Sequence, residues 1–141
     1  MAEGASLLAI GAGHMGGALL EGAFKAGGVI DPARSLIIDP QPSDRIRSLE
    51  GAYGVSVATI LRAPVAADAV LIAVKPQVLE NVLAPIRAYL PETAVYVSIA
   101  AGKTVAAIEE QLPAGGAVVR AMPNTPAAVG KGVSGLYAAS G

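Results

Sequence analysis

The sequence predicts an α/β fold, a doubly wound and mostly parallel sheet with helices on both faces. Short apolar runs of strand character alternate along the chain with stretches of helical periodicity, which is typical of strand–helix–strand units. The 141 residues suffice for one domain with a buried core, and no repeat, low-complexity segment or linker divides them. We therefore expect residues 1–141 to form one domain in which right-handed crossovers connect parallel strands.

The first expected elements form a strand–helix–strand unit. Residues 7–10 are a short continuous apolar run, which suits a strand buried on both faces. A helix is expected over 15–26, because small and apolar residues recur there on one stripe. A second strand follows at 36–39. Ser43 can cap the next helix, which runs to about Glu50, because its hydroxyl can accept a hydrogen bond from the first turn.

The middle of the chain repeats this pattern with weaker signals. Residues 54–57 predict a third strand, and 59–66 predict a helix, against which Pro64 counts. The strongly apolar run 69–74 predicts a fourth strand. Pro76 then begins a helix, since the first turn of a helix tolerates proline.

Helical spacing of apolar residues continues from Val78 to Leu90, and Pro85 is expected to kink or interrupt that helix. The remaining expected elements are strands at 94–99, 117–121 and 133–138 and a helix at 104–112.

Composition and charge exclude several classes of function. Ten Lys and Arg against 11 Asp and Glu leave the chain near neutral, so we expect no nucleic-acid or anionic-membrane partner. There is no cysteine and one histidine, so we expect neither a disulfide nor a metal site. No apolar run approaches the roughly 20 residues that span a bilayer, and the N-terminus lacks the cationic region of a signal peptide. We therefore expect a soluble, cytoplasmic protein.

The motif Gly11-Ala12-Gly13-His14-Met15-Gly16 joins the first expected strand to the first expected helix. GxGxxG alone is a weak signal, but this one lies in a strand–helix–strand unit of about 30 residues, as in dinucleotide-binding domains. Gly11 permits a tight turn, Gly13 lets a pyrophosphate approach the backbone, and Gly16 lets the helix pack closely on the sheet. The helix N-terminus attracts the phosphates, so the motif predicts a Rossmann-type dinucleotide site. His14 is expected to contribute its backbone amide rather than act as a catalytic acid.

Asp39 ends the second expected strand, about 20 residues beyond the glycine motif. An acid at this place accepts hydrogen bonds from the adenosine ribose and favours NAD over NADP. A turn-forming Asp before Pro40 needs no such role. Arg45 or Arg47 could instead hold a 2′-phosphate. These residues therefore leave both coenzymes open.

Further segments lie at the expected carboxyl ends of strands, where open α/β sheets bind ligands. Lys75, in the run 74–77, could reach a cofactor phosphate or ribose, or be a solvated lysine. The small residues 100–102 would let a flat ring lie against the backbone, although strand termination explains them equally well. The turn 122–126 could present the Asn124 amide to a substrate carboxylate, although a proline-rich loop needs no function.

These motifs, together and in this order, resemble the pyrroline-5-carboxylate reductase family over essentially the whole chain. The most specific is the run 119–127, because related β-hydroxyacid dehydrogenases share the glycine loop but not this run. The resemblance implies reduction of the cyclic imine 1-pyrroline-5-carboxylate to L-proline with NADPH, NADH being possible. With the motifs above, it gives as cofactor-binding residues Ile10, Gly11, Ala12, Gly13, His14, Met15, Gly16, Asp39, Ala73, Val74, Lys75, Pro76, Ala100, Ala101 and Gly102. It implies as substrate-binding residues Met122, Pro123, Asn124 and Thr125.

The resemblance also implies a second domain. Members of the family continue into a helical C-terminal domain that forms homo-oligomers and contributes hydroxyls to the active site, so we expect residues 1–141 alone to be inactive. The chain departs from the family at His14, where Asn is frequent, and at 58–61, which lacks a common Asn. No residue is an obvious proton donor, so no catalytic residue is assigned. The alternatives are a β-hydroxyacid dehydrogenase, another imine reductase, or a non-catalytic nucleotide-binding module.

Overall fold

The sheet is the frame on which every other element of the chain is placed. The computed structural model describes residues 4–100, 102, 104–113, 117–122 and 135–138. The strand order in the 7-stranded sheet is β3-β2-β1-β4-β5-β6-β7, and only the pairing of β7 with β6 is antiparallel. In chain order the strands are β1 (Leu7–Ile10), β2 (Leu36–Ile38), β3 (Ser56–Ala58), β4 (Ala69–Ile72), β5 (Val95–Ser98), β6 (Ala117–Met122) and β7 (Gly135–Ala138).

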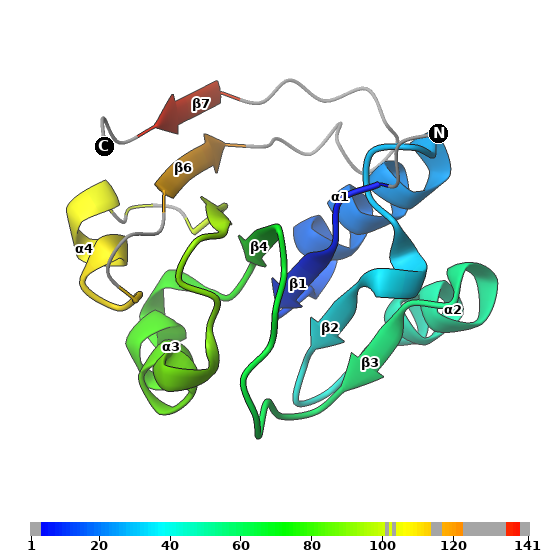
Figure 1. Ribbon diagram of the computed structural model, residues 1–141, viewed down its shortest axis with the longest axis horizontal. Helices are drawn as coiled ribbons and strands as arrows, with labels where there is room; N and C mark the ends of the chain where they lie inside the picture. The colour runs from blue at the N-terminus through cyan, green and yellow to red at the C-terminus, as the bar shows by residue number, and fades with distance from the viewer. Residues whose placement is uncertain (1–3, 101, 103, 114–116, 123–134, 139–141) are drawn as a thin grey trace.

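Helices cover both faces of the sheet, which confirms the predicted doubly wound fold (Figure 1). In β1, Leu7 and Ala9 pack with side chains of α1 and α2, whereas Leu8 and Ile10 pack with those of α3 and α4. All four are buried, because successive side chains of a strand point to opposite faces and both faces are covered. The helices are α1 (Gly13–Ala26), α2 (Asp44–Tyr53), α3 (Leu79–Ile86) and α4 (Val105–Glu109), with short 3₁₀ turns η1 (Pro32–Arg34), η2 (Pro76–Val78) and η3 (Arg87–Tyr89).

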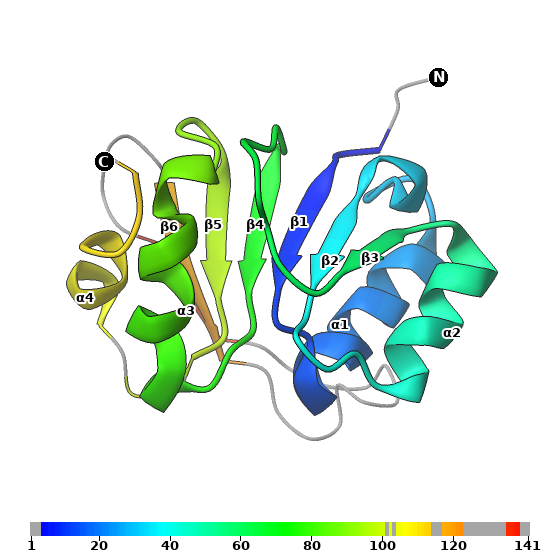
Figure 2. The same ribbon diagram turned by 90° about the horizontal axis from the view of Figure 1, so that it is seen from below.

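The direction of strand progression reverses between β1 and β4. From β1 the chain proceeds outward to β2 and β3, and from β4 it proceeds outward on the other side to β5 and β6. The segments that follow β1 and β4 therefore leave for opposite faces of the sheet (Figure 2). The Ala73 amide still donates to the Ile10 carbonyl at 2.9 Å, so the two segments begin side by side. In open α/β sheets such a point, at the carboxyl ends of the strands, is where ligands bind.

The helix predicted over residues 59–66 is wrong. The described chain between β3 and β4 contains no helix and passes in an irregular conformation over the face of the sheet that α3 and α4 cover. Pro64 has no amide to donate within a helix, and the amide of Val65 donates to the carbonyl of Tyr89 at 3.0 Å instead. Leu61 is buried in the core shared with α3 and α4. A long-range hydrogen bond and one buried side chain thus replace the local helix.

Proline also divides the segment that follows β4, as predicted. Pro76 begins the 3₁₀ turn η2 and Pro85 lies in the last turn of α3, after which the chain tightens into η3. The predicted helix over 104–112 is shorter than expected. It is the five-residue α4, whose first turn is capped by the Thr104 hydroxyl, which accepts from the Ala107 amide at 3.1 Å.

A polar clamp joins β1 to β4 at the amino ends of the strands, opposite the glycine motif. One carboxylate oxygen of Asp68 accepts from the Ser6 amide at 2.8 Å and from the Ser6 hydroxyl at 3.1 Å. The Asp68 amide donates in return to the Ser6 hydroxyl at 3.0 Å. The hydrogen bond from the Ser6 amide is the largest cause that lowers the pKa of Asp68 below 3.8, the Ser6 hydroxyl adds to it, and desolvation opposes both. The ionised carboxylate therefore fits the folded state better than the unfolded chain.

Asp68→Asn should lower the free energy of unfolding at pH 7, because the amide accepts these hydrogen bonds without the charge. The pKa of Asp68 is lowered in the folded state, so its contribution is present above pH 3.8 and is lost as the pH falls through the folded pKa. Urea titrations of both proteins at several pH values measure the difference. It should shrink below pH 3.8, and Glu92→Gln, an equal charge change at an exposed position, should show no such trend. A pH-independent difference would contradict the assignment.

Candidate functional site

Gly11 makes the tight turn that leads from β1 into α1. Its φ is +71°, a left-handed conformation that favours glycine, and its amide donates to the Ile38 carbonyl at 2.7 Å. A Cβ on Gly11 would lie 2.7 Å from Cγ1 of Val74, in the segment after β4. Gly11 therefore makes the tight turn that the sequence predicts, and the structure adds that Val74 leaves no room for a side chain there.

Gly16 lets α1 approach the end of β4. It is buried, and a Cβ at this position would lie 2.8 Å from the Cβ of Ala73, a separation that real side chains essentially never show. Any side chain here would push the helix away from the sheet. Gly16 is thus a packing glycine, as the sequence predicts.

Gly13 differs from both, because no neighbouring protein atom would clash with a side chain at this position. It is exposed, its φ is +51°, and the nearest atom to a built Cβ is the Ala73 carbonyl oxygen at 3.9 Å. The first turn of α1 therefore has open space over its backbone. A Cβ would project into this space, where the sequence predicts the pyrophosphate.

The N-terminus of α1 has no side-chain cap. Its N-cap residue is Ala12, which makes no side-chain hydrogen bond, and no acidic residue lies in the first turn. By contrast, Ser43 caps α2 and Thr104 caps α4 through their hydroxyls. The first amides of a helix need acceptors, and the helix dipole makes this end positive. The arrangement at α1 is suited to a bound phosphate.

A cavity of about 400 Å³ opens beside the first turn of α1. It is lined by Gly13, Asp39, Gln41, Ser43 and Arg45. The cavity joins the glycine motif to the start of α2, where dinucleotide-binding domains hold the adenosine ribose. We call the uncapped first turn of α1 the phosphate cradle. This cradle and the cavity together fit the phosphates and ribose of a dinucleotide.

Asp39 has a place in the turn and a place in the cavity. One of its carboxylate oxygens accepts from the Gln41 amide at 2.9 Å, which makes an Asx turn, and its own amide donates to the Ala58 carbonyl at 3.0 Å. Asp39 is also one of the residues that line the cavity. Asp39 can therefore form the turn and also hydrogen-bond the adenosine ribose, so the two interpretations are compatible.

The structure distinguishes Arg45 from Arg47, which the sequence left as equal candidates for contact with a 2′-phosphate. Arg45 lines the cavity and donates from Nε and Nη2 to one carboxylate oxygen of Glu21, at 2.9 and 2.7 Å. Arg47 is exposed on the other side of α2 and pairs with Glu50 at 3.5 Å. Sequence reasoning missed Gln41 and Ser43 as cavity residues; their place between the predicted second strand and Arg45 was the available signal.

The other predicted cofactor residues lie at the same edge of the sheet. Ala73 and Val74 follow β4 and contact the glycine motif, and Lys75 is exposed at the start of η2, whose first residue is Pro76. At the end of β5, Ala100 is buried and its amide donates to the Ser98 hydroxyl at 3.2 Å. Gly102 is exposed with φ +76°.

The predicted substrate residues fall largely outside the described part of the chain. Met122 ends β6, opposite Gly135 of β7, but its side chain is not described. The same holds for the side chain of His14, and Ala101, Pro123, Asn124 and Thr125 lie outside the described residues altogether. Within the described ranges, no cluster of three His, Cys, Asp or Glu could hold a metal ion, and no helix is long and apolar enough to cross a membrane.

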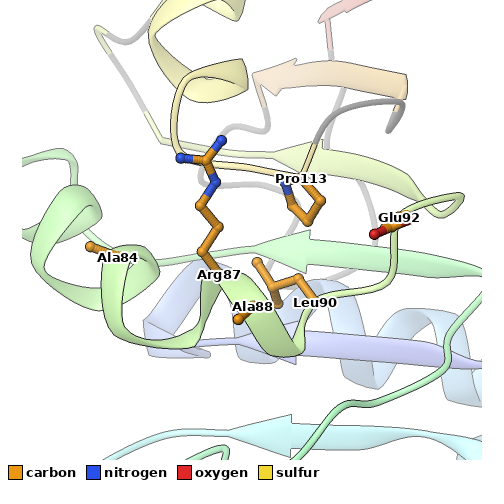
Figure 3. A pocket seen from close by; sticks show the side chains of 6 residues that line it. All are labelled: Ala84, Arg87, Ala88, Leu90, Glu92 and Pro113. Atoms are coloured by element: carbon orange, nitrogen blue, oxygen red, sulfur yellow. The ribbon is translucent and has the colours of Figure 1, made fainter.

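A second hollow lies at the opposite edge of the sheet (Figure 3). It measures about 410 Å³ and is lined by Ala84, Arg87, Ala88, Leu90, Glu92 and Pro113. These residues lie near the end of α3, in η3 and in the segments that lead into β5 and β6, so they lie near the amino ends of the strands. The hollow is therefore remote from the glycine motif and is no part of the dinucleotide site.

Comparison with known proteins gives a consistent set of relatives. Residues 7–102 match the family described as NADP oxidoreductase, coenzyme F420-dependent. The pyrroline-5-carboxylate reductase of Mycobacterium leprae is 39% identical over 137 residues, covering 94% of this chain and 46% of the relative. The chain thus spans about half the length of the curated relatives it matches.

Solved structures agree with this similarity. A pyrroline-5-carboxylate reductase from Coxiella burnetii superposes with a TM-score of 0.81 at 31% identity, covering 96% of this chain and 50% of that one. The pyrroline carboxylate reductase of Plasmodium falciparum, solved with NADP bound, gives a TM-score of 0.77 at 25% identity, covering 99% of this chain and 50% of that one.

The contrast between glycines makes the dinucleotide site testable. Gly13→Ala and Gly54→Ala both place a Cβ at positive φ in open space, so each should cost about 1–2 kcal/mol of stability. Only the Cβ at Gly13 occupies the phosphate cradle. We expect Gly13→Ala to weaken NADPH binding, followed by nicotinamide fluorescence, at least about tenfold, a loss of ~1.4 kcal/mol. Gly54→Ala should leave the affinity unchanged. Equal affinities of wild type and Gly13→Ala would contradict the site.

Proposed function

Because the chain belongs to the family described as NADP oxidoreductase, coenzyme F420-dependent, we propose that it is the dinucleotide-binding part of a pyrroline-5-carboxylate reductase. The reaction is the reduction of 1-pyrroline-5-carboxylate to L-proline. The observation that carries this proposal is the uncapped first turn of α1 beside a cavity, in a chain 39% identical to a protein of that name over 94% of its length.

The role of these residues in the reaction is binding and alignment. The chemistry that a reduced nicotinamide supplies when bound is hydride transfer to the imine carbon. The amides at the start of α1 hold the pyrophosphate, and the segment Ala73 to Pro76 together with Ala100 to Gly102 lines the nicotinamide side. Alignment to about 3–3.5 Å between the reacting atoms supplies much of the rate enhancement in such reactions. No residue of the described part is assigned as a proton donor.

We propose NADPH as the preferred coenzyme, with NADH as a weaker one. Support comes from the NADP in the family description and in the Plasmodium falciparum relative. The cavity adds a cation in Arg45 and a hydroxyl in Ser43 near the place of the ribose. Asp39 opposes this preference, because its carboxylate suits a ribose diol better than a phosphate.

Substrate binding is proposed for Met122, which ends β6 at the edge of the sheet where the glycine motif lies, and for Pro123, Asn124 and Thr125, which come next in the sequence. The substrate must also be held from the side opposite the nicotinamide. The relatives are about twice as long as this chain, and we propose that residues of that further length close the site and form the homo-oligomer.

Residues 1–141 by themselves should therefore bind NADPH but reduce 1-pyrroline-5-carboxylate slowly. Incomplete positioning removes part of the roughly 7–11 kcal/mol available from well-oriented reactants, and hence orders of magnitude in rate. NADPH oxidation at 340 nm measures turnover by this chain and by a chimera that carries the remaining half of the Mycobacterium leprae relative.

The chimera should reduce 1-pyrroline-5-carboxylate and should not oxidise β-hydroxyacids. Equal turnover by the 141-residue chain would show that its own residues complete the active site. A chimera that binds NADPH but acts only on β-hydroxyacids would overturn the proposed reaction.

A further inference from the structure

Arg45 lies along one side of α1. Gly13, Gly17 and Glu21 are spaced four residues apart and so share one face of this helix. A Cβ at Gly17 would lie 3.3 Å from Cδ of Arg45, which shows that the arginine stem crosses the helix at this glycine. Its guanidinium then reaches the carboxylate of Glu21.

This course directs the charge of Arg45 away from the phosphate cradle. The Cα atoms of Gly13 and Glu21 are about 12 Å apart along the helix axis, at 1.5 Å per residue. The Glu21 side chain points back toward the preceding turn, so it holds the guanidinium near Gly17. Nε and Nη2 of Arg45 both donate to the same oxygen of Glu21, although Arg45 is one of the residues that line the cavity beside Gly13. Arg45 thus borders the cavity, while its guanidinium is held by Glu21, which is not among the residues that line the cavity.

Because few other charged residues surround the cavity, the pairing of Arg45 with Glu21 determines the charge that a bound 2′-phosphate meets there. Asp39 and Arg45 are the charged side chains that line it. Asp44 lies in the first turn of α2, and Arg47 is paired with Glu50 on the exposed side. While Glu21 neutralises Arg45, the negative charge of Asp39 dominates the cavity and opposes a 2′-phosphate.

We propose that Glu21 is a positioning residue that sets the discrimination between NADPH and NADH by competing with the 2′-phosphate for Arg45. This inference rests on the proposed function, since it requires the dinucleotide to bind in this cavity. With NADH, Arg45 stays on Glu21 and the ribose diol faces Asp39. With NADPH, the guanidinium leaves Glu21 and turns back over Gly17 toward the phosphate.

The strength of the pair permits such an exchange. The side chains of Arg45 and Glu21 are 33% and 38% exposed, so water screens their attraction. A dianionic phosphate that accepts from a guanidinium makes a stronger, charge-assisted hydrogen bond. The 2′-phosphate therefore displaces Glu21 from Arg45, and the affinity for NADPH is lowered because the Arg45–Glu21 pair must be broken. Removal of the Glu21 charge should raise the affinity for NADPH by a factor of about 1.5 to 5, which corresponds to the free energies of exposed ion pairs.

The test measures dissociation constants for NADPH and NADH in Glu21→Gln, Arg45→Gln and the double variant. Glu21→Gln should raise the affinity for NADPH about 1.5-fold to 5-fold and leave that for NADH unchanged. Arg45→Gln should lower the affinity for NADPH about tenfold, as for loss of a charged hydrogen bond. The double variant should match Arg45→Gln, because Glu21 acts only through the arginine.

Glu50→Gln is the matched control, because it removes the same charge from the Arg47–Glu50 pair of α2 without contact to the cavity. It should change neither affinity. The pair 2′,5′-ADP and ADP, used as probes in parallel, reports the adenosine end without the nicotinamide.

The outcomes separate this inference from the proposed function. Failure of wild type to bind either dinucleotide would overturn the proposed function. Binding of both, with an NADPH-to-NADH ratio that Glu21→Gln leaves unchanged, would overturn the role of Glu21 alone. A gain for NADPH that persists in the double variant would also contradict it, because the effect would not pass through Arg45.

Discussion

The close approach of α1 to the end of β4 is the constraint on which the rest of the site depends. Gly11 turns the chain against Val74, and Gly16 brings the helix against Ala73, with no room for a Cβ at either glycine. The helix must therefore begin directly at the point where strand progression reverses. Both connections leave this point for opposite faces, and the space between them is where a ligand can reach free backbone amides.

The absence of a side-chain cap at the start of α1 is as informative as the packing around it. Hydroxyl side chains cap α2 and α4, whereas α1 begins at Ala12 without a cap. An exposed Gly13 keeps the space over these amides open. The sheet thus supplies a positive, uncrowded helix end, while the charges proposed to distinguish one dinucleotide from another are those of Arg45, on the neighbouring helix α2, and of its partner Glu21, on α1 itself.

The sequence predicted the elements whose causes are local. The alternation of buried strands and the glycine motif follow from residues adjacent in the chain, and the structure confirms the strands to within a few residues at their ends. The helix predicted over 59–66 is wrong because a hydrogen bond from Val65 to Tyr89 outweighs local propensity. Glu21 could not be identified, since its pairing with Arg45 depends on how α1 and α2 pack. Sequence alone likewise gave no reason to prefer Arg45 over Arg47.

The most direct test of this account is the change in backbone amide resonances of the labelled chain during titration with NADP⁺. If the uncapped start of α1 and the adjoining cavity bind the dinucleotide, the largest shifts should fall on residues 13–16 and on Gln41 and Ser43. The hollow near Arg87 and Glu92, at the other edge of the sheet, should be unaffected. Shifts centred on that hollow, or saturation without change at Gly13, would contradict the account.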